Sequence, residues 1–262
     1  MRFLIVGDIV GRPGRRILRE KLPSLREEFQ IDAVIVNGEN AAGGLGITPE
    51  VCEEILGCGV DVITTGNHIW DKKEVLDYIA RQPRLLRPLN YPDSVPGRGS
   101  LILEREGKAW AVVNLSGRVF MSPLDCPFQR IEKELVHLRE RTRSILVDFH
   151  AEASSEKIAM GWFLDGRVSC VFGTHTHVVT ADERILPQGT AYITDIGMTG
   201  AHDSVIGIEV ADIVGRFLTQ MPVKYRVAKE NVKLNGIVVE VDDETGRAQD
   251  IFRISVPLLN NV

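Results

Sequence analysis

The chain has 262 residues, 44% of them hydrophobic and 26% charged, which are ordinary values for a globular protein. Its formal net charge of −5 excludes a global basic field that would hold nucleic acid by its backbone. The length favours one large α/β domain over residues 1–262, and an anionic substrate would need a local positive centre.

The apolar runs and the cysteines indicate a cytoplasmic protein. No run approaches the length of a transmembrane helix. The first run, MRFLIV, breaks at Gly7-Asp8, so we expect a core strand there and not a signal peptide. The cysteines form no C-x-x-C pair and are expected to be reduced and mostly buried: Cys52, Cys58, Cys126 and Cys170.

Strand and helix patterns alternate at the start of the chain. Short apolar, β-branched runs predict strands over 3–6, 33–36 and 60–65. The stretches that follow them predict helices over 13–29, 49–57 and 71–80. Strands that alternate with helices indicate a parallel sheet with helices on its faces.

The rest of the chain adds antiparallel patterns. Residues 101–105 and 109–114 predict a hairpin around Glu106-Gly107-Lys108. Further strands are predicted over 145–149, 168–172 and 191–194, further helices over 127–143 and 206–218, and edge strands over 223–227, 236–241 and 251–256. A helical or loop insertion fits residues 83–98. The predicted fold is α/β, a layered sandwich of two mixed sheets flanked by helices.

Polar residues follow five of the apolar strands. They are Gly7-Asp8, residues 37–40, residues 66–68, residues 150–152 and residues 173–177. In open α/β sheets, ligands bind outside the carboxyl ends of the strands. Asp8 taken alone fits an ordinary turn or helix cap, and the same holds for each of the asparagines. Five such groups at one edge are not explained by turns, so we predict a functional site there.

The residue types in this set favour metal ions. It offers two carboxylates, two amide oxygens and three imidazoles: Asp8, Glu39, Asn40, Asn67, His150, His175 and His177. Seven ligands are enough for two ions with open positions for water, and a carboxylate such as Glu39 could bridge them. The set lacks Cys, which favours Fe, Mn, Co or Zn over softer ions. Two divalent ions, two carboxylates and one hydroxide would leave a positive centre that attracts a phosphate ester.

The His175 and His177 pair is expected on one side of an extended segment, because alternate residues of such a segment share a side. We assign no role to Thr174 and Thr176, which are expected to face away and form local hydrogen bonds.

His68 follows Asn67 directly and is interpreted as a general acid that protonates a leaving oxygen. Asp71 could orient this imidazole, but a capping box with Asp71 as N-cap and Glu74 at the third helical position is favoured. Three further roles stay open. They concern Arg12 (phosphate contact or solvated), Glu152 (partner of a ligand histidine or solvent-facing) and His202 (substrate contact or turn).

The blocks GDIVG, VNGENAAGG, TTGNHIWDKKE, VDFHAE, GTHTHV, YITDIGMTG and DSVIG resemble the calcineurin-like metallophosphoesterases, and more narrowly their bacterial YmdB-like branch. They span residues 7 to 207. The resemblance implies two ions, iron with manganese as a substitute. It implies one ligand set of Asp8, Glu39, Asn40 and His177 and a second of Glu39, Asn67, His150 and His175.

The chain departs from the broader superfamily in two motifs. Val10 stands where an Asp-x-His motif has its histidine, and Gly38-Glu39-Asn40 replaces Gly-Asp-x-x-Asp. We infer that Asn40 takes the neutral ligand place that Val10 cannot fill. In the YmdB-like branch this pattern is the expected one.

The branch is associated with 2′,3′-cyclic nucleotide phosphodiesterase activity. The resemblance therefore predicts a dinuclear hydrolase in which a bridging hydroxide attacks phosphorus and His68 protonates the leaving ribose oxygen. Two alternatives are a phosphomonoesterase and a nucleotide- or RNA-binding regulator with little turnover. The expected partner is a small phosphate ester. No membrane partner is expected, RNA is possible but not indicated, and a homo-oligomer is left open.

Overall fold

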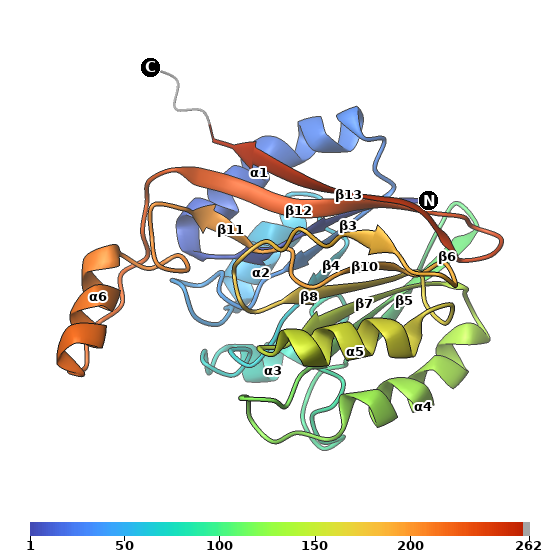
Figure 1. Cartoon of the computed structure of the whole chain (residues 1–262), viewed down its shortest axis with the longest axis horizontal. Helices are drawn as coiled ribbons and strands as arrows, with labels where there is room; N and C mark the ends of the chain where they lie inside the picture. The colour runs from blue at the N-terminus through green and yellow to red at the C-terminus, as the bar shows by residue number, and fades with distance from the viewer. Residues whose placement is uncertain (259–262) are drawn as a thin grey trace.

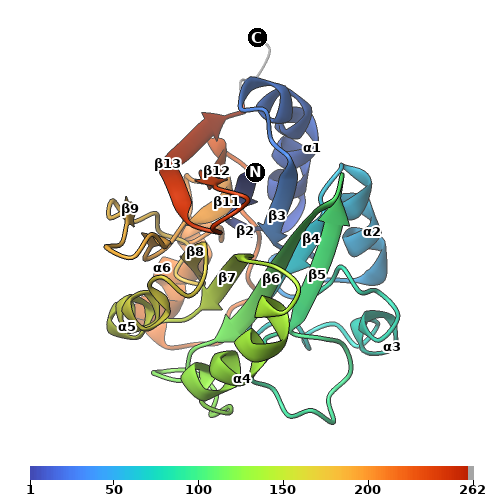
Figure 2. The ribbon, with the colours of Figure 1, turned by 90° about the vertical axis from the view of Figure 1, so that its right-hand side faces the viewer.

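Two β-sheets face each other at the centre of the protein, and helices cover their outer faces (Figures 1 and 2). The computed structural model describes residues 1–258 of the chain. The predicted fold class, a helix-flanked sandwich of two mixed sheets, is confirmed.

The first sheet has seven strands in the order β2-β11-β12-β1-β3-β4, with β13 paired to β12. Its strands are β1 (Arg2–Val6), β2 (Asp8–Ile9), β3 (Ala33–Asn37), β4 (Val62–Thr64), β11 (Met198–Ala201), β12 (Val232–Val241) and β13 (Ala248–Pro257). Strands β1, β3 and β4 run parallel, whereas β12 is antiparallel to β1. The carboxyl ends of the three parallel strands therefore reach the same edge.

The second sheet has six strands in the order β5-β6-β7-β8-β10-β9. They are β5 (Ser100–Arg105), β6 (Lys108–Ser116), β7 (Ser144–His150), β8 (Cys170–Thr174), β9 (Arg184–Ile185) and β10 (Ala191–Ile193). Strands β6, β7, β8 and β10 are parallel. The predicted hairpin is confirmed: β5 and β6 pair antiparallel, and Glu106 and Gly107 both have positive φ, as a tight hairpin turn requires.

The helices are α1 (Gly11–Glu28), α2 (Pro49–Gly57), α3 (Val75–Ile79), α4 (Pro127–Arg139), α5 (Ser154–Leu164) and α6 (Val210–Thr219). In Figures 1 and 2, α1 and α2 cover the first sheet, and α4 and α5 cover the second. None of the helices within residues 1–258 combines the length and apolar character that crossing a bilayer requires.

The alternation of side chains along β1 shows why the layers stack in this order. Phe3 and Ile5 point into the core between the two sheets, whereas Leu4 and Val6 pack in the core beneath α1 and α2. Both faces of the strand are thus buried, which explains an unbroken apolar run in place of an apolar–polar alternation. A third core lies between the second sheet and helices α4 and α5.

Three predicted elements differ from the observed ones. The helix predicted over 71–80 is reduced to Val75–Ile79, because residues 71–74 form turns. Residues 223–227 form no strand and make a single bridge, between Val227 and Ile208. The helix predicted from residue 206 begins at Val210, and it projects away from the sheets (Figure 1). The segment 83–98 is a loop with isolated bridges.

Candidate metal centre

The structure brings the ends of five strands together at one edge of the sandwich. Two groups of side chains there have ligand atoms within 4.8 Å of one another. One consists of Glu39, His150 and His175, and the other of Asp8, Glu39 and His177. Glu39 belongs to both groups, so it lies between them. Asp8, Glu39 and His150 are at most 1% exposed.

The two predicted amide ligands lie at the same place. The Oδ1 atom of Asn67 is 3.0 Å from Nε2 of His150. Asn40 lines the cavity that Glu39 and His177 also line. All seven residues that the sequence analysis proposed as ligands are therefore gathered at this edge.

The acceptor atoms around His150 face one another. Its Nδ1 lies 2.9 Å from the Thr174 hydroxyl, which donates its own proton to Asp148, so Nδ1 carries the hydrogen and donates it. The opposite atom, Nε2, lies 3.0 Å from Nδ1 of His175 and 3.1 Å from Oε2 of Glu39. A neutral His150 would thus place the lone pair of Nε2 against these two acceptors and against Oδ1 of Asn67. This is unfavourable unless a proton or a metal cation lies between them.

Two oxygen atoms at this edge have no hydrogen-bond partner within residues 1–258. They are Oδ1 of Asp8 and Oδ1 of Asn40, and both are buried. A buried acceptor without a partner is costly, so such atoms call for an explanation such as an ion. His177 donates from Nδ1 to the Ile206 carbonyl, 2.9 Å away, which leaves its Nε2 as an acceptor. The donor set, oxygen and imidazole nitrogen without thiolate, fits borderline divalent cations.

The pKa shifts report the same demand for positive charge. Burial alone would raise the pKa of Glu39, but the adjacent His150 outweighs it and lowers that pKa to about 2. Burial alone would lower the pKa of His150, but Glu39 and then Asp8 outweigh it and raise that pKa to about 9. Burial and the charge of His150 lower the pKa of His175 to about 3. A bound cation would take over the position that the proton on His150 holds.

Gly66 is required by the closeness of the backbone to these ligands. A Cβ atom at this position would lie 2.2 Å from Nε2 of His150 and 2.3 Å from Oε2 of Glu39. Any side chain there would collide with two residues of the site. This explains why a glycine precedes Asn67 and His68 at the end of β4.

His68 is held by Asp71, and the capping-box prediction is wrong. The Nδ1 atom of His68 lies 2.8 Å from Oδ2 of Asp71. The N-cap of α3 is Glu74, whose side chain forms no capping hydrogen bond. The Asp71 carboxylate therefore orients the imidazole of His68, with Nε2 left for a substrate. His68 lines the cavity that Glu39 and His177 line.

The loop of His175 and His177 is not extended, contrary to the prediction. The two residues have φ values of 96° and 64°, in the left-handed region. Between them, Thr176 donates from its backbone N and its hydroxyl to Asp195. Asp195 also accepts from the buried Lys157, 2.6 Å away. This anchor holds the loop in a conformation that brings both histidines to the site.

A chain of buried hydrogen bonds supports His150 and was not predicted. Asp148 accepts from Asn37, Thr64 and Thr174, and Thr174 accepts from His150. Thr174, to which no role was assigned, thus connects a carboxylate to a ligand histidine. The signal in the sequence is the spacing of Asp148 and His150, which places both on one face of β7.

Two residues with open roles now have partners. Oε2 of Glu152 lies 3.0 Å from Nε2 of His175, so Glu152 fixes the tautomer with Nδ1 facing the site. His202 lies 3.2 Å from the amide nitrogen of Asn235 and outside the cavity of the metal centre.

The cavity above the metal centre has a volume of about 420 Å³. One wall consists of the polar residues described above, and we call the whole space the catalytic cavity. The lining also includes apolar and aromatic side chains: Leu45, Ile206, Ile208, Ile213 and Tyr225. The Tyr225 ring is covered by the guanidinium of Arg216, 5.4 Å from the ring centre. A cavity lined by both polar and apolar side chains suits a ligand with a charged end and a flat apolar end.

Comparisons with known proteins agree with this arrangement. The family model described as YmdB-like protein matches residues 4–254. The 2′,3′-cyclic-nucleotide 2′-phosphodiesterase of Bacillus subtilis (strain 168) is 48% identical over 256 residues, which cover 98% of this chain and 97% of that protein. The crystal structure of a novel phosphatase from Mycoplasma pneumoniae has a TM-score of 0.92 and 37% identity, covering 98% of this chain and 93% of that one.

A more distant similarity concerns the fold alone. The NAD nucleotidase of Haemophilus influenzae superposes with a TM-score of 0.60 at 12% identity. The match covers 98% of this chain and 56% of that protein.

Proposed function

The chain belongs to the YmdB-like protein family, and on that premise we propose that its catalytic cavity hydrolyses 2′,3′-cyclic nucleotides with two bound metal ions. The broader class, phosphoric ester hydrolase, follows from the relatives, which are named as a phosphodiesterase and a phosphatase. The observation that carries the proposal is the facing set of acceptor atoms around Glu39.

Each ion would have its own set of ligands. Asp8, Glu39, Asn40 and His177 would hold one ion, and Glu39, Asn67, His150 and His175 would hold the other. We propose iron as the metal, with manganese as a substitute. When bound, such ions lower the pKa of water to about 7 and neutralise charge that develops on phosphoryl oxygens.

The residues of the chain provide the remaining chemistry. Opening of the cyclic ester forms a bond from the oxygen of water to phosphorus, breaks one bond between phosphorus and a ribose oxygen, and releases one proton of the attacking water to solvent. The departing oxygen needs a proton, and His68 donates it from Nε2 while Asp71 holds Nδ1. Glu152 and Thr174 hold the ligand histidines in the required tautomers.

The apolar wall supports a nucleotide as the substrate. Tyr225 and three isoleucines line the same cavity of about 420 Å³ as the polar residues. We propose that the nucleobase lies against Tyr225 while the phosphate lies at the metal centre. A small phosphomonoester would leave this wall uncovered, which favours the cyclic nucleotide over the phosphomonoesterase alternative.

The experiment incubates manganese- or iron-loaded protein with 2′,3′-cyclic AMP and separates the products by chromatography. One new adenosine monophosphate peak, absent with a chelator, is the expected result, and its identity shows which ribose oxygen leaves. Hydrolysis of an aryl phosphomonoester without hydrolysis of the cyclic nucleotide would contradict the substrate assignment. Binding of the nucleotide by metal-loaded protein with no turnover of either compound would favour a regulator.

A further inference from the structure

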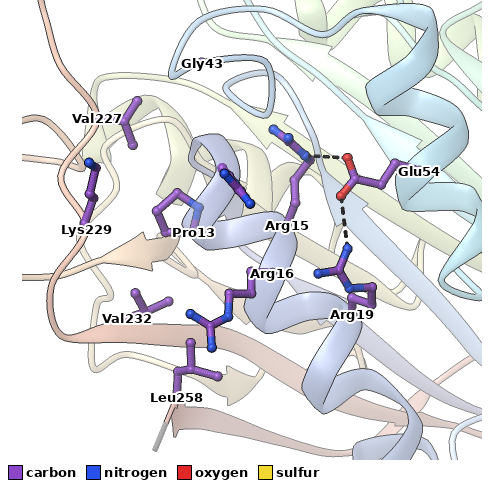
Figure 3. Close-up of a pocket in the computed structure, with 11 residues that line it drawn as sticks. Pro13, Arg15, Arg16, Arg19, Gly43, Glu54, Val227, Lys229, Val232 and Leu258 are labelled. Carbon is purple, nitrogen blue, oxygen red and sulfur yellow. Dashed lines mark hydrogen bonds and ion pairs between the residues drawn. The ribbon is translucent and has the colours of Figure 1, made fainter. Parts of the chain in front are cut away.

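A second, larger pocket lies along helix α1 and is lined by basic side chains (Figure 3). It has a volume of about 810 Å³, and we call it the basic pocket. We propose that the basic pocket binds the phosphodiester backbone of an RNA whose 3′-terminal 2′,3′-cyclic phosphate lies in the catalytic cavity. The substrates would then include oligoribonucleotides, an inference that rests on the proposed function.

The charge of the basic pocket is opposite to that of the whole protein. Five cationic side chains line it against one carboxylate, Glu54, which leaves a net charge of +4 in a chain of net charge −5. The cations are Arg12, Arg15, Arg16, Arg19 and Lys229. A local excess of this size attracts a polyanion, because each phosphate that it neutralises releases counterions.

The four arginines share one face of α1. Steps of three or four residues connect positions 12, 15, 16 and 19, so they form one stripe on the helix. Figure 3 shows Arg15, Arg16 and Arg19 of this stripe. The buried residues Ile17, Leu18 and Leu22 fix the opposite side of α1 in the core of the first sheet. The stripe is therefore held rigidly at the rim of the pocket.

Not all of the cations are free to bind phosphate. Arg15 pairs with Glu54 at 2.8 Å and donates to the Ala41 carbonyl, so it holds the neighbouring loop. Arg12 and Lys229 make no ion pair within residues 1–258. Both side chains are exposed and are therefore available to a ligand.

The basic pocket and the catalytic cavity share their walls. Gly43 lines the basic pocket, and its neighbour Gly44 lines the catalytic cavity. One segment serves both spaces, since Tyr225 lines the cavity whereas Val227 and Lys229 line the pocket. A Cβ atom on Gly44 would lie 2.9 Å from the side chain of Val227, so the loop and the segment are in contact. The two spaces are therefore adjacent.

The chemistry of the cyclic ester connects these spaces to RNA. A 2′,3′-cyclic phosphate can exist only at the 3′ end of an RNA, because its phosphorus is esterified to both the 2′ and the 3′ oxygen of one ribose and has no bond to a following nucleotide. A cyclic mononucleotide is thus the shortest member of a series in which every added nucleotide contributes one negative phosphodiester. The bonds that form and break are the same along the series, so the added phosphates require a binding site and no new catalytic group.

The test measures binding of a 5′-fluorescein hexaribonucleotide with a 3′-phosphate by fluorescence anisotropy. It compares the full-length protein with the double variant Arg12→Ala/Lys229→Ala. We expect Kd to rise about 10-fold, and the slope of log Kd against log salt to fall by about 1.4, the loss of two single-strand phosphate contacts. The control variant Lys133→Ala/Arg141→Ala removes one exposed charge in the middle of α4 and one just after this helix, and it should stay within about twofold of the wild type.

Activity separates this inference from the proposed function. In both double variants, kcat/KM for 2′,3′-cyclic AMP should stay within about twofold of the wild type. In the wild type, kcat/KM should be higher for a hexaribonucleotide with a 2′,3′-cyclic end than for 2′,3′-cyclic AMP, and only Arg12→Ala/Lys229→Ala should lose this difference. Equal hexamer affinity in wild type and Arg12→Ala/Lys229→Ala would overturn the inference. So would inorganic tripolyphosphate binding as tightly as the hexamer, which would indicate a small-anion site. If the wild type does not turn over 2′,3′-cyclic AMP, the proposed function is contradicted instead. The anisotropy measurement would still test whether the basic pocket binds RNA.

Discussion

His68 differs from the ligand histidines in what surrounds it. The side chain of His68 is 31% exposed and its partner Asp71 is also partly exposed, whereas His150 is fully buried. An imidazole at the mouth of the cavity can exchange protons with solvent between turnovers. This is what a proton donor requires and what a structural ligand does not.

Replacing this acid should separate chemistry from metal binding. In His68→Ala, we expect kcat for 2′,3′-cyclic AMP to fall about 10²- to 10⁴-fold, since the leaving oxygen loses its proton donor. Metal content, measured by mass spectrometry, should stay unchanged. An aryl phosphodiester, whose leaving group needs no proton, serves as the control and should lose far less activity. Loss of metal in parallel with activity would refute the acid role.

Thr174 should affect metal affinity without touching a substrate. Thr174→Val removes the hydroxyl that connects His150 to Asp148. We expect the affinity for one ion to fall about 10- to 100-fold, the usual effect of losing a partner of a metal ligand. Titration with Mn²⁺ monitored by calorimetry measures this. Thr245→Val, in an exposed turn, is the matched control, and equal affinities in the two variants would contradict the role of Thr174.

At the scale of residues, the sequence was sufficient to predict that the candidate ligands lie close together. The candidate ligands directly follow predicted strands, and the carboxyl ends of parallel strands lie at the same edge of a sheet. Asp71 was assigned to a capping box because its sequence spacing fits both roles, and only the turns at 71–74 exclude the cap. The role of Thr174 depends on a contact between β7 and β8, which local spacing does not contain.

At the scale of elements, the site depends on how β4 ends. Gly66 lets the backbone pass within contact distance of His150 and Glu39, two of the proposed ligands. We expect Gly66→Ala to lose most of its bound metal and its activity, because the added methyl group occupies the place of His150 and Glu39. Gly57→Ala in α2, where a Cβ atom would meet nothing within 4 Å, is the control and should keep both. Metal analysis after gel filtration checks this, and a metal-replete Gly66→Ala protein would contradict the described geometry.

The elements that were predicted well have both faces in contact with the core. Strands β1 and β3 were predicted from their apolar runs. Such a run is buried on both faces only when the sheet lies between two other layers of the fold. The pattern of α6 predicts an amphipathic helix, but its only buried residue is Asp212, and Phe217 and Leu218 are more than 70% exposed. Periodicity indicates that a helix forms, but it does not say which surface, if any, covers its apolar face.

At the scale of the whole molecule, the burial of Cys52 in the core beneath α1 and α2 makes stability sensitive to high pH. Burial raises the pKa of this thiol to about 11 from an ordinary value of 9.0. Between pH 9 and 11 the unfolded chain releases the proton while the folded chain keeps it, so the free energy of unfolding falls as pH rises. From pH 8 to pH 10 this amounts to about 1 kcal/mol.

The comparison with Cys52→Ala isolates this contribution. Urea unfolding at the two pH values should show that the wild type loses about 1 kcal/mol more than the variant, whatever the stability of the variant at pH 8. The same pH dependence in both proteins would mean that Cys52 titrates normally in the folded state.

Glu39 is the residue common to both groups of candidate ligand atoms, so the proposed dinuclear centre depends on it. The most direct measurement is therefore the number of metal ions bound per chain after loading and desalting, in the wild type and in Glu39→Ala. The account predicts two ions in the wild type and almost none in the variant, with two retained in Glu27→Ala, an exposed glutamate of α1. One ion in the wild type, or two in Glu39→Ala, would contradict a dinuclear centre built around this carboxylate.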